Sequence, residues 1–341
     1  MAAKATLKQL SEILGISIST VSRALKDHPD IAESTKKKVR ELAELLEYEP
    51  NALAVQLRTN ASSLIGVIVP DISGFFYHSF IAGLESEARS WGYSLMILQS
   101  NNSSETEASN LKICRFNRTA GILVAMAPQT TDMSPFERTR DAGTPIVFFD
   151  KVPEEKGYPK VTVADEEAGS LAAEAIIQNG SGKILALFGD PALSITRKRR
   201  KAFEDAFASR SVEAEVQIKH AASRAEAEHI ASSLSNMHSE RPDTVFCMSD
   251  EILVGVMAAV NDAGLNIPDD LSILALSNGF FPSLFKPGIA YVETSGEKLG
   301  RKSFEILQRC MSGDTPTEEC TVAARFVAGR SLKRANGKKA D

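Results

Sequence analysis

The sequence predicts a small all-α helix-turn-helix domain followed by an α/β core of two doubly wound parallel-sheet lobes. Three observations predict this fold. The first sixty residues show helical apolar spacing and no strand pattern. From residue 63 onward, short apolar strands alternate with helical segments, which is typical of parallel sheets covered on both faces. The alternation runs in two successive series, which indicates two lobes.

Residues 7–25, LKQLSEILGISISTVSRAL, are expected to form two short helices joined by a tight turn. Gly15 interrupts the first helix, where a backbone free to take positive φ suits a sharp turn. The three-and-four spacing of a helix buried on one face is seen at Leu7, Leu10, Ile13 and Leu14.

The second helix starts after Ser17, a suitable N-cap, and is expected to bury Val21 and Leu25. Its remaining side chains face outward: Ile18, Ser19, Ser22 and Arg23. This is the layout of a helix-turn-helix, whose second helix enters the DNA major groove. An ordinary helical hairpin is the alternative. Residues 1–40 favour the first reading, because eight basic and four acidic residues give them a local net charge of +4.

A third helix is expected over 32–47, with one apolar face formed by Val39, Leu42, Ala43 and Leu46. Next comes YEPNALAVQLRTN, residues 48–60, in which only about two helical turns are favoured. Isolated helices this short are marginal in water, so the segment is a candidate switch as well as a tether. We therefore expect a DNA-binding domain over 1–48, a hinge helix and linker over 49–61, and a core over 62–341.

The core strands come in two expected series. The first is 63–70, 94–100, 121–126 and 145–150, separated by helices 77–91, 105–117 and 134–142. The second is 161–165, 183–190, 212–219, 244–250 and 271–277, with helices 166–179, 197–209, 223–237 and 250–263. A tail of strand 289–294, helix 296–312 and strand 321–329 can complete both sheets by crossing back.

Lobe 1 is thus expected to hold about 62–161 plus 291–322, and lobe 2 about 162–290 plus 323–335. Ligands of open α/β sheets bind beyond the carboxyl ends of the strands. Two lobes facing each other would therefore hold a small molecule in the cleft between them.

Composition excludes several classes of function. The formal charge of -5 gives no global attraction to phosphate, so nucleic-acid contacts must be local. No signal peptide or membrane-spanning run is visible, so a cytoplasmic protein without membrane partners is expected. The four cysteines form no CxxC pair and the five histidines are scattered, so neither a disulfide framework nor a metal site is expected.

No catalytic constellation is visible either, and neither an enzyme nor a cofactor is expected. Residues 180–183, GSGK, look like part of a phosphate-binding loop. However, Ile184 replaces the required serine or threonine and a strand follows in place of a helix. No pair of carboxylates stands out as acid and base.

The whole arrangement resembles the lactose-repressor (LacI/GalR) family of bacterial transcription factors. The pieces that carry the resemblance are TLKQLSEILGISISTVSRAL, YEPNALAVQLR, GVIVPDISGFF and IPDDLSILAL, within a match from Thr6 to about Leu332. It implies an operator-binding homodimer, with a core similar to periplasmic sugar-binding proteins that responds to a small effector. A dimer also suits the polar tail 331–341, which has no apolar heptads.

The resemblance implies a set of DNA-binding residues. Leu57 would part a central base step in the minor groove, and two such hinges meeting there require a dimer and a near-palindromic operator. For Leu57, burial against its own domain is the alternative. The implied set is Ile18, Ser19, Ser22 and Arg23 on bases and phosphates, Thr6, Ser17 and Thr20 on the backbone, and Asn51, Leu57 and Arg58 in the hinge.

The resemblance also implies a set of effector-binding residues, although core packing is an even alternative for each phenylalanine. The set is Asp71, Phe75, Phe76, Met126, Asp150, Arg199, Asp250 and Ser277. Ser277 departs from the family, which commonly carries an aspartate there. Serine loses the charge-assisted acceptor, and we expect a more positive cleft around Arg199. The expected effector is a sugar or a sugar derivative, and a more positive cleft would also admit a phosphorylated or acidic sugar.

Repression relieved by an inducer is expected over corepression. Two other classes of protein are weighed against this hypothesis. A sugar-binding transport component would use the same two lobes but has no use for residues 1–60. A sugar-metabolising enzyme would need a nucleophile or an acid–base pair, and the sequence shows neither.

Overall fold

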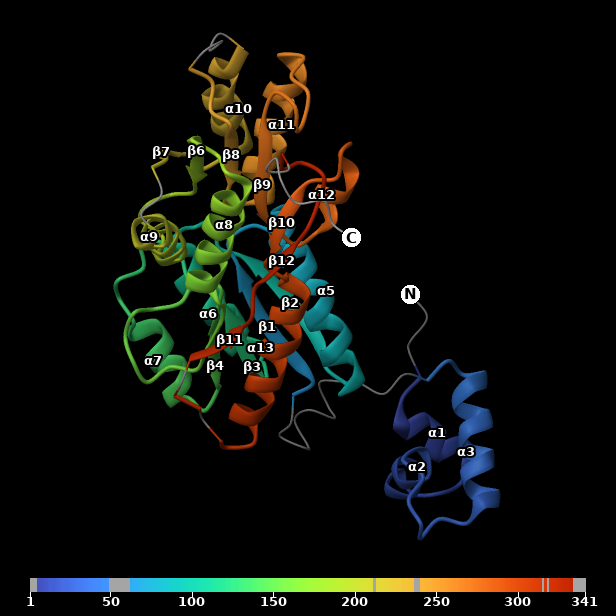
Figure 1. Cartoon of the computed structure of the whole chain (residues 1–341). Coiled ribbons are helices and arrows are strands. Elements are labelled where there is room, and N and C mark those ends of the chain that lie inside the picture. Colours follow the sequence, from blue (N-terminus) through green and yellow to red (C-terminus); the bar gives the residue numbers. More distant parts are fainter. Residues whose placement is uncertain are drawn as a thin grey trace. The chain divides into compact units, whose positions relative to one another are not determined.

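Figure 1 shows the computed structural model of the chain, which describes residues 5–48, 62–210, 213–235, 240–314, 316–317 and 319–333. The chain divides into two units, Met1–Ser62 and Ser63–Asp341. In the part of the chain that the structure describes, no helix combines the length and the apolar character needed to span a membrane.

The first unit consists of three helices: α1 (Leu7–Leu14), α2 (Ile18–Leu25) and α3 (Glu33–Leu45). The Thr6 side chain accepts from the Gln9 amide while the Gln9 side chain accepts from the Thr6 amide, so a capping box starts α1. Gly15 ends that helix at φ 66°. Ser17 caps α2 by accepting from the Thr20 amide at 3.1 Å.

The core of this unit is small. Its fully buried apolar side chains are Leu10, Val21, Ala24, Val39 and Ala43. The prediction that Ile13 is buried was wrong, because its side chain is 61% exposed. Among the described helices, α2 and α3 pack on α1, and the side of α1 that they cover contains Leu10 and not Ile13.

An ion-pair network joins the turn after α2 to α3. The Lys36 ammonium, with its side chain almost entirely buried, lies 3.1 Å from Asp27 Oδ1 and 2.7 Å from Glu33 Oε1. Arg40 donates to the same Asp27 oxygen at 2.7 Å. The hydrogen bond from Lys36 and the charges of Lys36 and Arg40 lower the pKa of Asp27. A lysine can therefore occupy the covered face of α3, because the carboxylates of Asp27 and Glu33 neutralise its charge.

The second unit contains two sheets. The first sheet has the order β11 (Glu319–Val322), β5 (Lys160–Val163), β4 (Ile146–Phe149), β3 (Gly121–Val124), β1 (Leu64–Val69) and β2 (Ser94–Gln99). The second has the order β12 (Arg325–Val327), β10 (Ala290–Glu293), β9 (Ser272–Ser277), β8 (Thr244–Cys247), β6 (Lys183–Phe188) and β7 (Glu215–His220). Every pairing is parallel except that of β12 with β10.

Strand β5 belongs to the first sheet, where it pairs with β4 and β11. The sequence had placed it in the second series, and that assignment was wrong. The cause is the helix that follows it: α8 (Asp165–Asn179) packs on the second sheet, so the chain crosses between sheets after β5 and not before it. The chain crosses between the two sheets again after β10 and after β11. The first two crossings lie slightly later than the expected residues 161 and 290.

Helices cover both sheets. On the first sheet, α5 (Phe75–Ser90) and α13 (Gly296–Met311) pack together, and α6 (Ser104–Phe116) packs with α7 (Ser134–Asp141). On the second, α8 packs with α9 (Ser194–Ser209), and α10 (Arg224–Ser232) with α11 (Asp250–Asp262). The short η1 (Ser233–Ser235) and α12 (Phe280–Leu284) complete this lobe. We call the first sheet with its helices lobe 1 and the second lobe 2.

The contact between α5 and α13 depends on glycine. A Cβ built on Gly83 would lie 2.3 Å from the carbonyl oxygen of Glu297, and one on Gly300 would lie 2.3 Å from that of Phe80. Both neighbours are backbone atoms, so the helices approach as closely as their main chains allow. This contact fixes α5, whose first turn faces lobe 2.

Gly83→Ala is expected to lower the free energy of unfolding by about 1–3 kcal/mol, because the added methyl group overlaps backbone that can move only with all of α13. Urea denaturation followed by circular dichroism measures the change. Ser86→Ala is the matched control, since it is exposed on the same helix and should stay within about 0.5 kcal/mol of the parent. Equal stability of the two variants would contradict the close-approach account.

Candidate functional site

A cavity of about 160 Å³ lies between the lobes at the carboxyl ends of their strands. Lobe 1 contributes the start of α5 and the two residues after β4, and lobe 2 contributes α9, the β8–α11 turn and the end of β9. The lining residues are Gly74, Phe76, Tyr77, Asp150, Lys151, Ile195, Arg199, Met248, Ser249, Asp250, Glu251, Leu276, Ser277, Asn278 and Thr294. A ligand in this cavity would contact both lobes at once.

On the lobe 1 side, Tyr77 Oη donates a hydrogen bond of 2.6 Å to Asp150 Oδ2. Both side chains are buried. Burial raises the pKa of Asp150, and the hydrogen bond from Tyr77 and the nearby Lys151 and Arg199 oppose this shift. Burial and the Asp150 charge raise the pKa of Tyr77 well above its usual value, so the phenol remains the donor. Asp150 directly follows β4, and its φ of 56° lies in the left-handed region, where the extended strand cannot continue.

On the lobe 2 side, Arg199 Nε donates to Asp165 Oδ1 at 2.8 Å. Arg199 lies on α9 and Asp165 in the first turn of α8, and both are nearly fully buried. The helices meet at Gly169, where an added Cβ would lie 2.2 Å from the Arg199 carbonyl oxygen. The guanidinium that lines the cavity is therefore already paired with a carboxylate behind it.

Ser277, at the position where the resemblance to the LacI family implied an aspartate, acts as a hydrogen-bond donor. Its hydroxyl donates to Asp250 Oδ1 at 2.5 Å and accepts from the Gly279 amide at 2.9 Å. The Asn278 amide lies 3.4 Å from the other oxygen of Asp250. Burial nevertheless raises the pKa of Asp250 to about 6, because these hydrogen bonds only partly replace its hydration.

The charge of the cavity differs from the sequence-based expectation. Three carboxylates line it, those of Asp150, Asp250 and Glu251, against the two cations Lys151 and Arg199. Lys151 also donates to Asn102 Oδ1 at 3.1 Å, and burial lowers its pKa. The expected more positive cleft was therefore wrong. Its premise, an unpaired Arg199, fails because Asp165 supplies the missing negative charge.

Three sequence-predicted residues do not line this cavity. Asp71 is exposed and accepts from the amide and hydroxyl of Ser73. Phe75 packs its ring on Phe281, with centroids 4.0 Å apart. Met126 lines a neighbouring hollow of about 270 Å³, between two lobe 1 loops and the start of α9. The other predicted residues, Phe76, Asp150, Arg199, Asp250 and Ser277, are brought together here.

Sequence reasoning missed four ionisable groups at this site: Tyr77, Lys151, Asp165 and Glu251. Tyr77 and Glu251 adjoin predicted residues, so their neighbours Phe76 and Asp250 were a signal for them. Lys151 follows Asp150 in the same way. Nothing local marks Asp165, because its role depends on the packing of α8 against α9.

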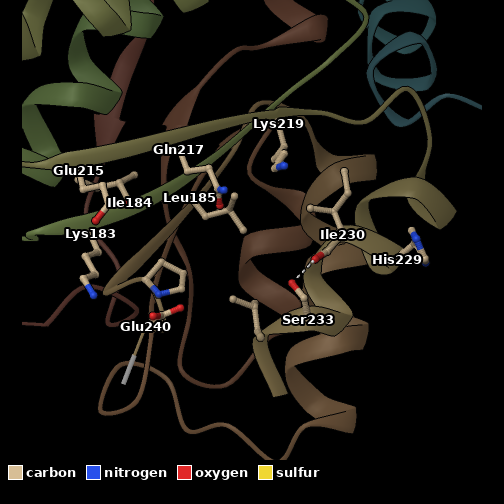
Figure 2. A pocket seen from close by; sticks show the side chains of 12 residues that line it. Lys183, Ile184, Leu185, Glu215, Gln217, Lys219, His229, Ile230, Ser233 and Glu240 are labelled. Carbon is tan, nitrogen blue, oxygen red and sulfur yellow. Dashed lines mark hydrogen bonds between the residues drawn. The ribbon is translucent and has the colours of Figure 1, made fainter. Parts of the chain in front are cut away.

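A larger hollow, about 600 Å³, lies at the β7 edge of the second sheet (Figure 2). Its walls are β6, β7, α10, η1 and the stretch at Glu240 and Pro242, next to residues 236–239, which are outside the description. All these walls belong to lobe 2. A ligand there would make the same contacts in any orientation of the lobes, and so could not shift their equilibrium. The smaller cavity is the better candidate.

In the first unit, α2 presents Ile18, Ser19 and Arg23 as exposed side chains, while Ser22 is half-buried. The Ser17 hydroxyl lies 2.7 Å from that of Ser19 and 2.8 Å from that of Thr20. Thr6 and Ser17 thus stand at the starts of α1 and α2, where backbone amides are directed outward. The hinge residues Asn51, Leu57 and Arg58 lie outside the described residues.

Two family models match the chain. One describes periplasmic binding proteins and the sugar binding domain of the LacI family and matches residues 62–329. The other describes bacterial regulatory proteins of the lacI family and matches residues 6–51. The chain belongs to the LacI family. The expected family and the expected class of regulatory protein are thereby confirmed.

Curated relatives of this LacI-family chain include the HTH-type transcriptional repressor PurR of Vibrio atlanticus, 29% identical over 304 residues, 89% of this chain and 91% of the relative. PurR of Vibrio campbellii is 27% identical and covers 97% of this chain and 100% of its own. Both relatives are named as repressors and not as enzymes.

Solved structures confirm the expected fold class. The lac repressor dimer bound to operator and the anti-inducer ONPF has a TM-score of 0.84 at 20% identity, covering 97% of this chain and 99% of its own. A LacI-family transcriptional regulator from Silicibacter pomeroyi has a TM-score of 0.77 at 23% identity, covering 97% and 100%.

Asp250→Asn is expected to change how stability depends on pH. The pKa of Asp250 is raised from 3.8 to about 6, so the folded chain binds the extra proton between these values. Stability then rises as pH falls through 6, and above pH 6 the ionised carboxylate costs on the order of 3 kcal/mol. The asparagine variant should melt at a higher temperature than the parent at pH 8, with a difference that shrinks towards pH 4.

Melting curves from pH 4 to pH 8 measure this, with Asp71→Asn as the matched control. The pKa of Asp71 is lowered by its hydrogen bonds to Ser73, so its contribution is lost only at pH values below the range of the Asp250 effect. Its difference from the parent should stay constant between pH 5 and pH 8. A pH-independent difference for Asp250→Asn as well would refute the raised pKa.

Proposed function

We propose that this LacI-family chain is a homodimeric, sequence-specific, cytoplasmic repressor whose operator affinity is set by a small effector bound between its lobes. The observation that carries the proposal is the cavity lined by polar groups of both lobes, in a chain that also carries a helix-turn-helix with an exposed face. An effector that binds one lobe orientation better than another shifts the equilibrium between them.

The proposal divides the chain as the sequence does, into a DNA-binding domain over 1–48, a hinge over 49–61 and an effector-binding core over 62–341. DNA contacts are assigned to Thr6, Ser17, Ile18, Ser19, Thr20, Ser22, Arg23, Asn51, Leu57 and Arg58. Effector contacts are assigned to Phe76, Asp150, Arg199, Asp250 and Ser277, with Tyr77 and Glu251 added from the cavity lining.

The cavity favours a small uncharged polyhydroxyl effector over a phosphorylated or acidic one. Carboxylates accept pairs of hydroxyl hydrogens, and Phe76 offers an aromatic surface to the apolar face of a sugar ring. An added anion would be repelled by Asp150, Asp250 and Glu251 while Arg199 is held by Asp165. A neutral sugar is therefore preferred to a sugar phosphate, and we propose that it is bound without chemical change.

A dimer is supported by apolar side chains left exposed around strand β2, one edge of the first sheet. They are Ile97 on β2, Ile113 and Phe116 on α6, and Trp91 at the end of α5; Phe116 is 88% exposed. Helices α5 and α6 both pack on β2. Apolar surface of this kind marks association sites, and the lac repressor that shares this fold is described as a dimer on its operator.

Arg23→Ala is expected to weaken operator binding by about 1–3 kcal/mol, because the guanidinium fork is the donor on the exposed face of α2 best suited to guanine or phosphate. A near-palindromic duplex selected from a random DNA library, titrated in gel shifts at graded salt, measures the loss. Leu57→Ala should also weaken binding. The control is Lys201→Ala, which removes one exposed positive charge from the effector-binding core and should leave operator binding unchanged.

Two results would contradict the DNA-binding proposal. The first is failure to select any specific duplex. The second is equal affinity for the palindrome and for one isolated half of it, because a dimer with two reading heads must prefer the full site.

A thermal-shift screen of neutral pentoses and hexoses beside their phosphates tests the effector proposal. We expect a neutral sugar to stabilise the chain by about 2.7 kcal/mol at a concentration 100 times its Kd, and its phosphate to stabilise it less. Asp150→Asn should weaken this binding about ten- to a hundredfold, since it removes a charged acceptor. Asp71→Asn, outside the cavity, should bind as the parent does.

Stronger stabilisation by the phosphate than by the neutral sugar would overturn the charge argument. Mass spectrometry of the recovered sugar checks the second half of the proposal: the sugar should be unchanged after incubation, and turnover would make the chain an enzyme.

A further inference from the structure

The first turn of α5 is held by lobe 2, although α5 belongs to lobe 1. Its N-cap is Gly74, which offers no side chain to the free amides. The Phe75 amide instead donates to Glu251 Oε1 at 3.2 Å, and Glu251 lies in the first turn of α11. A carboxylate from the opposite lobe thus does the work that a serine or aspartate N-cap does within one helix.

Two further groups of lobe 2 contact the same residue. The ring of Phe281, on α12, lies against that of Phe75 with centroids 4.0 Å apart and planes inclined at 44°. The Asn278 side-chain amide lies 3.5 Å from the Phe75 carbonyl oxygen. Phe75 is therefore bound through its amide, its ring and its carbonyl group. In Figure 1, α5 and α12 lie on the same side of the core, as these contacts require.

These groups adjoin the cavity directly. Glu251 and Asn278 line it, as do Gly74 and Phe76, the residues on either side of Phe75. On its other side Phe75 faces an outer groove that it shares with Asn278 and Phe281. One wall of the cavity is thus made by both lobes, with Gly74 and Phe76 from lobe 1 and Glu251 and Asn278 from lobe 2. The ring pair of Phe75 and Phe281 lies behind this wall.

Two ion pairs that also join the lobes are weaker restraints. Arg197 on α9 pairs with Glu154 of lobe 1 at 2.8 Å, but their side chains are 51% and 81% exposed. Lys198 lies 3.5 Å from Glu319, also near the surface. Exposed ion pairs contribute little, since water and salt screen them. The partly buried contacts of Phe75 combine a charge-assisted hydrogen bond with an aromatic pair and should dominate.

We propose that Glu251, Asn278 and Phe281 form a clasp on Phe75 that closes this wall of the cleft without an effector and positions the first turn of α5. Glu251 is a positioning residue in this scheme: it acts through Phe75 on Phe76 and Tyr77, which face the effector cavity. Because Glu251 also faces the cavity, an effector donor that takes its carboxylate competes with the Phe75 amide. The competition between effector and Phe75 amide rests on the proposed effector function. The clasp itself can be tested without effector and without DNA.

Hydrogen exchange of the full chain, followed by mass spectrometry of peptides, tests the clasp. Glu251→Ala should speed exchange of the amides at residues 75–78 about five- to tenfold, the loss expected for one charge-assisted cap. Glu251→Gln keeps an acceptor oxygen and should rescue most of the protection. Phe281→Ala should speed exchange in the same peptide, while peptides of β3 and β8 inside the sheets stay as in the parent.

Two matched controls keep a general loss of structure apart from loss of the clasp. Leu284→Ala removes another large apolar side chain of α12, which is 58% exposed and does not line the groove beside Phe75. Glu105→Ala removes an exposed first-turn acid of α6. Both should leave residues 75–78 as protected as in the parent.

The clasp is refuted if Glu251→Ala and Phe281→Ala leave the exchange at 75–78 unchanged. It is also refuted if Leu284→Ala speeds that exchange as much as Phe281→Ala does. Failure of every sugar to bind would instead count against the effector proposal, and would leave the exchange result standing.

Discussion

The core depends on one constraint of connectivity: the chain passes between the two sheets at three places, after β5, β10 and β11. The crossings touch one another, as when the Ala164 amide donates to the Val322 carbonyl oxygen at 2.9 Å. Because three segments of the chain connect the lobes, the lobes cannot separate. Each connecting segment is only a few residues long and can bend. Movement is therefore restricted to a change in the angle of the cleft, the type of motion that a ligand held between lobes can control.

The same constraint explains the electrostatics of the cleft. Asp165 starts α8 immediately after the first crossing, so it lies at the boundary of the lobes and pairs with Arg199 there. Asp150 and Asp250 follow strands of opposite lobes and meet across the cavity. All three acids lie at the end of a strand or at the start of a helix, and none lies within a long loop. Negative charge therefore accumulates where the strands converge, and the buried guanidinium offsets only part of it.

Much of the fold could be predicted from local signals. Gly15 and Ser17 marked helix ends of the first unit because capping is a matter of a few neighbouring residues. The apolar runs of the core identified its strands for the same reason. Ile13 and β5 were misjudged because each depends on a partner: the helix that covers a side chain, or the sheet that receives a strand, is not written in the adjacent sequence.

In the candidate site, too, features with a local signal could be predicted and those that depend on distant partners could not. Phe76, Asp150, Arg199, Asp250 and Ser277 follow strand ends or a family motif, and the structure brings them to one cavity. The pairing of Arg199 with Asp165 and the capping of Phe75 by Glu251 could not be predicted, because these partners are 34 and 176 residues apart in sequence. Both pairings change the chemistry that the same residues would have alone.

The late return of the chain to lobe 1 has a consequence for synthesis on the ribosome. Helix α13, which buries Leu299, Phe304 and Leu307 against the first sheet, is made only after nearly all of lobe 2. Until then one face of the strands β1 to β5 is covered by α5 without α13, and lobe 2 lacks β12. Because domains emerge N-terminal first at about 5–20 residues per second, the three-helix unit can fold many seconds before either lobe is complete. During that interval the nascent chain carries a folded DNA-binding unit on an incompletely folded core. Its uncovered apolar surface is then available for chaperones to bind.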